Sequence, residues 1–86
     1  MVMARDSMIW VVDDDPELRK MVGTYLLDQG YDVRSLCDVK QFEARLACQR
    51  PDLVVLDLML PGDDGLTALR RLRDAGDDLP VVMLTA

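Results

Sequence analysis

The chain has 86 residues, 10 of them basic and 16 acidic, for a net charge of −6, and it contains no histidine. This length accommodates one domain, and the absence of histidine excludes histidine-based catalysis and histidine metal ligands. The acidic balance argues against a nucleic-acid-binding surface in this segment, because contacts to phosphates need a basic patch.

The first half of the chain predicts two strands and two helices. Met8 to Val12 is an unbroken apolar run, typical of a strand buried on both faces. A helix then begins after Asp15 as cap, with Pro16 at the first helical position, and ends at Gly30. We expect its apolar stripe to bury five residues, namely Leu18, Met21, Val22, Tyr25 and Leu26.

The alternating segment 31–35 is typical of a half-exposed edge strand. A second helix follows, where Asp38 and Gln41 form the pattern of a capping box. Its inward face is expected to carry Val39, Phe42 and Leu46, and it ends before Pro51.

The second half repeats the pattern. A third strand is expected over Leu53 to Asp57, and a fourth over Val81 to Leu84. Between them a third helix is expected to turn Leu66, Leu69 and Leu72 inward. Strict alternation of strands and helices predicts an α/β fold with right-handed crossovers and a doubly wound parallel sheet. Because the all-apolar strands belong inside and the alternating strand at the edge, we expect the strand order 2-1-3-4.

Acidic residues follow the two central strands. Asp13, Asp14 and Asp15 come directly after the first strand, and Asp57 ends the third. Parallel neighbouring strands place these ends at one edge, where open α/β sheets bind ligands. Carboxylates gathered there repel one another unless they hold a cation. Asp15 precedes proline and is interpreted as the helix cap, which leaves Asp13, Asp14 and Asp57 as the candidate cation ligands.

No run approaches the ~18 apolar residues of a membrane span, and no secretory segment begins the chain. Cys37 and Cys48 lack a CxxC spacing, so we expect them to be free and buried in a cytoplasmic protein.

Three stretches resemble the receiver domain of two-component response regulators, and in particular the OmpR-like ones. They are residues 11–15, residues 57–65 and residues 82–86, in the same order and at the same separations. The resemblance implies a flavodoxin-like (CheY-like) fold that stops before the fifth strand, with residues 1–7 as an N-terminal extension and 8–86 as a partial receiver domain.

The resemblance also implies roles for individual residues. Asp57 would be the phosphoacceptor, and Thr85 the switch hydroxyl that moves to bind the phosphoryl group. Asp13, Asp14, Asp57 and the backbone carbonyl of Met59 would bind Mg²⁺, a cation that prefers hard oxygen ligands. The lysine and the aromatic switch residue of the family have no counterpart in these 86 residues.

The resemblance implies a signalling domain, not an enzyme, with at most self-catalysed phosphotransfer and autodephosphorylation. It would accept the phosphoryl group from a sensor histidine kinase and control a DNA-binding output domain outside this chain. Two alternatives are a haloacid-dehalogenase-like phosphatase fragment using Asp13 and Asp15, and a pseudo-receiver that only mediates protein contacts. Because the fourth strand would leave an apolar edge, we also expect self-association.

Overall fold

The computed structural model describes residues 7–57 and 65–84. In chain order the elements are β1 (Met8–Val12), α1 (Pro16–Asp28), β2 (Asp32–Leu36), α2 (Val39–Leu46), β3 (Leu53–Asp57), α3 (Gly65–Asp74) and β4 (Val81–Leu84). The predicted alternation of strands and helices is therefore confirmed. The second strand begins and ends one residue later than expected.

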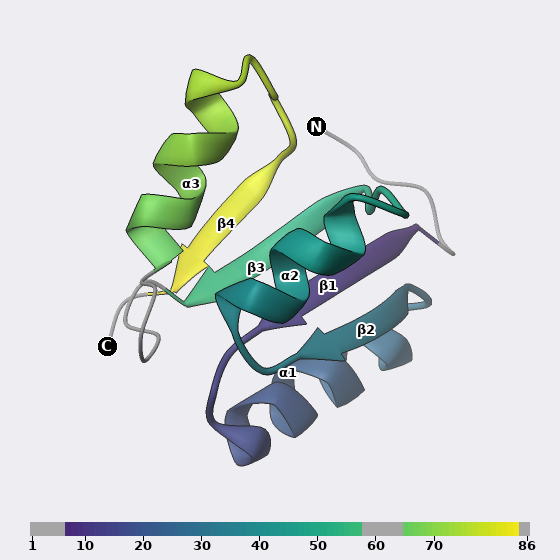
Figure 1. The fold of residues 1–86 in the computed structure, drawn as a ribbon. Coiled ribbons are helices and arrows are strands. Elements are labelled where there is room, and N and C mark those ends of the chain that lie inside the picture. The colour runs from purple at the N-terminus through teal and green to yellow at the C-terminus, as the bar shows by residue number, and fades with distance from the viewer. Residues whose placement is uncertain (1–6, 58–64, 85–86) are drawn as a thin grey trace.

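The four strands form one parallel sheet in the order β2-β1-β3-β4, as predicted. The register sets Val12 of β1 beside Leu56 of β3, so the ends of these two strands lie at the same level. Helix α1 covers one face of the sheet, and α2 and α3 cover the other (Figure 1). This arrangement is the doubly wound, flavodoxin-like fold.

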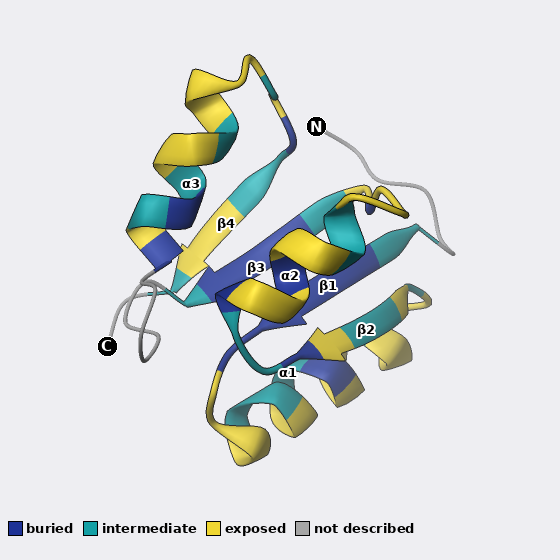
Figure 2. Cartoon of the chain, viewed as in Figure 1, coloured by how far each residue is buried: buried dark blue, intermediate teal, exposed yellow. Residues whose placement is uncertain are grey.

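Each face of the sheet has its own apolar core. On the face of α2 and α3, Trp10 and Phe42 are almost fully buried and meet edge to face, with ring centroids 6.1 Å apart. On the α1 face, Ile9, Val11 and Val55 pack against partly buried residues of α1 and β2. Burial is concentrated in β1 and β3, as expected for the two central strands (Figure 2).

The helix ends follow the predicted local chemistry. The Asp15 side chain accepts hydrogen bonds from the backbone N–H groups of Glu17 and Leu18. Gly30, with a φ of 95°, ends α1 in a left-handed conformation that glycine adopts without strain. Asp38 caps α2 by accepting from the Gln41 N–H at 2.7 Å, and the Gln41 side chain returns to the Cys37 N–H at 3.0 Å.

Some side chains that were expected to be buried are exposed. Met21 and Tyr25 of α1 each expose 63% of their surface, and Leu66 of α3 exposes 39%. The inward direction of α1 is set by Val22, Gly23 and Leu26, and Met21 and Tyr25 lie on the far side of that line. Among the described residues no helix is long and apolar enough to cross a membrane.

Candidate functional site

The acidic residues that follow the two central strands do lie together. Asp13 comes directly after β1 and Asp57 ends β3, so the parallel register brings both to one edge of the sheet. One carboxylate oxygen from each of Asp13, Asp14 and Asp57 lies within 4.8 Å of the other two. We call these three residues the acidic cluster.

Asp13 is the buried member of the acidic cluster, with only 1% of its surface exposed. Its Oδ1 accepts a hydrogen bond from the Asp15 N–H at 2.9 Å, and its own N–H donates to the Leu36 carbonyl at 3.1 Å. The Arg19 guanidinium donates to the Asp13 carbonyl oxygen at 2.6 Å. These bonds fix both the backbone and the carboxylate plane.

The second oxygen of Asp13 is in a different situation. Oδ2 is buried and has no hydrogen-bond partner among the described residues. Burial raises the pKa of the Asp13 carboxyl, although the hydrogen bond from Asp15 opposes the shift. The nearby charges of Asp57 and Asp14 raise this pKa further. A buried anionic oxygen without a donor is costly unless a cation neutralises it.

Asp14 is exposed and Asp57 is half-buried, so the cluster opens to solvent on their side. Asp15 does not belong to it, since its carboxylate is used to cap α1, as predicted. The haloacid-dehalogenase-like alternative needs Asp15 as the acid–base residue beside Asp13. That role conflicts with the observed cap.

The donor set fits a small, hard divalent cation. It offers carboxylate oxygens with up to three negative charges, and one of those oxygens is buried without a donor. Mg²⁺ prefers oxygen ligands and keeps several waters, which the exposed side of the cluster permits. Met59 and Thr85, the other two predicted site residues, lie outside the described residues.

Sequence reasoning missed the contribution of Arg19. Its guanidinium reaches back from α1 to the carbonyl at the end of β1 and holds the turn that carries Asp13. The signal in the sequence is weak, because an arginine early in a helix is usually a solvated charge.

The chain is similar to known proteins along nearly its whole length. Residues 9–86 match the family described as response regulator receiver domain. The chain is 46% identical over 78 residues to the response regulator MprA of Mycolicibacterium vanbaalenii, which covers 91% of this chain and 34% of the relative. The chain thus spans about a third of the length of the curated relatives it matches.

Solved structures agree with this match. The response regulator TrrA from Thermotoga maritima in complex with Mg²⁺-BeF superposes with a TM-score of 0.87 at 30% identity, covering 93% of this chain and 70% of that one. The BeF₃-activated N-terminal receiver domain of Klebsiella pneumoniae RstA gives a TM-score of 0.82 at 41% identity, covering 91% and 66%.

Proposed function

Because the chain belongs to the response regulator receiver family, we propose that Asp57 is its phosphoacceptor and that a sensor histidine kinase is its donor. The observation that carries this proposal is the convergence of Asp13, Asp14 and Asp57 within 4.8 Å at the ends of β1 and β3. Receiver domains are signalling domains, so the expected product is a modified Asp57 and not a released metabolite.

The chemistry is a transfer between two covalent carriers. A carboxylate oxygen of Asp57 attacks the phosphorus of a phosphohistidine, forming an O–P bond as the P–N bond breaks. The electron pair of the broken bond stays on the imidazole nitrogen, which takes up a proton. The resulting acyl phosphate is the signalling state, and self-catalysed hydrolysis by water ends it.

The acidic cluster by itself repels a phosphoryl group. We propose that Asp13, Asp14, Asp57 and the Met59 carbonyl hold Mg²⁺, which neutralises the charge that develops on the phosphoryl oxygens. Asp13 would act as a ligand held in place, because its backbone N–H is bonded to the Leu36 carbonyl and its Oδ1 to the Asp15 N–H. Arg19 supports the same turn through the Asp13 carbonyl.

The response to phosphorylation is proposed to pass through Thr85, whose hydroxyl binds the phosphoryl group. In a longer protein of the relatives' length, this movement would control an output domain that binds DNA. The proposal for Thr85 rests on the match of residues 82–86 to the family pattern.

The phosphoacceptor is tested by intact-mass analysis after treatment with acetyl phosphate and Mg²⁺. The wild-type chain should gain the mass of one phosphoryl group, and Asp57→Asn should gain none, since the amide keeps the size but is not a nucleophile. Asp15→Asn is the matched control and should label like the wild type. Labelling of Asp57→Asn with loss in Asp13→Asn would favour the phosphatase alternative, and an unlabelled wild type would favour the pseudo-receiver.

We also propose that the 86-residue chain self-associates through β4. This strand is at the edge of the described sheet, and Val82 and Met83 each expose 48% of their surface. An exposed apolar edge strand pairs readily with another chain. Sedimentation at micromolar concentration should show species above 9.7 kDa, and Val82→Lys should reduce them.

Leu27→Lys is the control for this experiment, because Leu27 is comparably exposed but lies on α1. A monomeric wild type, or equal effects of the two lysine substitutions, would contradict association through β4.

A further inference from the structure

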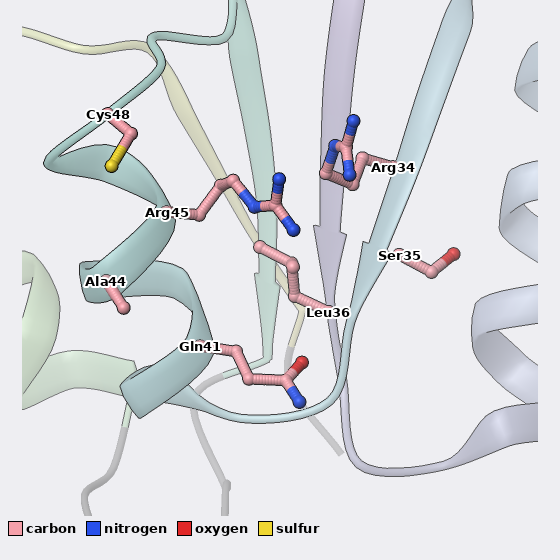
Figure 3. Close-up of a pocket in the computed structure, with 7 residues that line it drawn as sticks. All are labelled: Arg34, Ser35, Leu36, Gln41, Ala44, Arg45 and Cys48. Atoms are coloured by element: carbon pink, nitrogen blue, oxygen red, sulfur yellow. The ribbon is translucent and has the colours of Figure 1, made fainter.

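A cavity of about 470 Å³ lies between the edge strand β2 and helix α2, and the acidic cluster contributes nothing to its lining (Figure 3). Its walls carry two guanidinium groups, from Arg34 of β2 and Arg45 of α2. The cavity is also lined by Leu36, Gln41 and Cys48. Its volume is within the range of small-molecule sites.

The two arginines differ from others in this chain. Arg50 pairs with both carboxylate oxygens of Asp77, and Arg71 pairs with both of Glu43. Neither Arg34 nor Arg45 has an ion pair within residues 7–57 and 65–84, although acidic residues outnumber basic ones in the chain. Both side chains are half-buried, which limits the water available to them.

Arg34 carries the clearest sign of a missing partner. Its Nε is buried and makes no hydrogen bond in the described part of the chain. The register pairs Arg34 with Trp10 of β1, so its side chain lies on the face covered by α2. A buried guanidinium N–H without an acceptor costs free energy, and an anion beside the Arg34 guanidinium would supply the ion pair that the described residues do not.

The cavity lies at one edge of the described sheet, because β2 is an edge strand and β4 is the strand at the opposite edge. Figure 3 shows the Arg45 side chain reaching from α2 toward β2, while the Ser35 side chain points away from both guanidinium groups. The amide oxygen of Gln41 accepts a hydrogen bond from the Cys37 N–H, so the amide NH₂ group of Gln41 can serve as a donor.

We propose that this cavity binds a small molecule that carries a carboxylate or a phosphate on a short apolar body. The guanidinium fork matches the oxygens of either anion in a bidentate manner. The buried Leu36 side chain provides an apolar wall, and the volume exceeds what an inorganic anion alone would fill. The inference goes beyond phosphoacceptor function, since it involves none of the residues of that site.

The test is a titration of the ¹⁵N-labelled chain followed by NMR, without divalent cations so that the acidic cluster attracts no anion. The probes are phenyl phosphate, benzoate and inorganic phosphate. We expect saturable shifts at residues 34–36 and 41–48 with phenyl phosphate or benzoate, weaker ones with inorganic phosphate, and weakening as salt screens the charges. The tighter of the two aromatic probes identifies the anion.

Arg34→Gln and Arg45→Gln should each weaken binding by roughly tenfold or more, the cost of one charge-assisted bond. Arg70→Gln is the matched control, because it removes the same charge from an exposed position on α3 and should leave binding unchanged. Arg45 lies on the surface of α2 and not in the sheet. The Arg45→Gln variant should therefore stay folded and test binding even if Arg34→Gln unfolds. Absence of saturable shifts, or equal losses in Arg45→Gln and Arg70→Gln, would overturn the proposal.

Discussion

Replacing Asp13 with asparagine should stabilise the metal-free chain. Asp13 is buried, and its Oδ2 has no hydrogen-bond donor among the described residues. Its charge also faces those of Asp14 and Asp57. Asparagine keeps the shape and the oxygen that accepts from the Asp15 N–H, and its amino group can donate to the neighbouring carboxylates. The substitution therefore removes repulsion without leaving a cavity.

The size of the effect follows from the separation of the charges. At 4.8 Å, the upper limit of the separations in the acidic cluster, two unit charges repel by about 1 kcal/mol in bulk water and by about 3.5 kcal/mol in an effective dielectric of about 20. Asp14 is exposed, so its interaction with Asp13 is near the lower value, whereas Asp57 is half-buried. We expect Asp13→Asn to raise the free energy of unfolding by about 1–3.5 kcal/mol at pH 7.

Urea denaturation at pH 7 with a chelator present measures this change. Asp15→Asn is the matched control, since asparagine caps a helix as well as aspartate and the expected change is close to zero. The pKa of Asp13 is raised in the folded state, so its charge costs stability only as the pH rises through that pKa. The gain should therefore shrink in acid, where Asp13 is protonated. Destabilisation by Asp13→Asn at pH 7 would refute the reasoning.

Two further predictions concern the metal and the far end of the sheet. At a concentration about a hundredfold above Kd, Mg²⁺ should raise Tm by roughly 10–20 °C. Calorimetry should show a smaller rise in Tm for Asp14→Ala and an unchanged rise for Asp15→Ala. If both variants reduced the rise equally, the assignment of Asp15 as a cap would be contradicted. Arg50 holds the pKa of Asp77 down to about 2, so this pair should stabilise the fold above about pH 4 and lose its effect as the pH falls toward 2. Arg50→Gln should flatten that acid limb of the denaturation curve, and an unchanged limb would count against the pair.

The strands and helices could be predicted because local chemistry and packing agree. Unbroken apolar runs marked β1 and β3, and Asp15, Gly30 and Asp38 marked helix ends by the bonds they make. The burial of individual helix residues was less accessible. A Cβ added at Gly23 would lie 3.6 Å from Val33, so α1 comes close to the sheet at a residue without a side chain. Because a glycine adds nothing to an apolar stripe, the stripe predicted from the sequence placed Met21 and Tyr25 on the buried face instead.

The burial of the two cysteines also differs from the prediction. Both are free, but Cys48 is exposed and Cys37 is half-buried, which corrects the expectation that both are buried. Cys48 follows the end of α2, where the last turn faces solvent. The Arg34–Arg45 cavity was likewise missed, since 11 positions separate residues that only the crossover from β2 to α2 brings together.

The acidic cluster contains three identical side chains in three environments, and this difference bears on which of them can accept a phosphoryl group. Asp13 is too deeply buried for an incoming phosphohistidine to reach its oxygens, and its carboxylate already serves the turn before α1. Asp14 is exposed but lies beyond the end of β1, with no strand to fix it. Asp57 combines the two requirements of a nucleophile, because it is held by the last position of β3 and is only half-buried. Burial and strand geometry therefore favour Asp57 as the phosphoacceptor, independently of the family pattern.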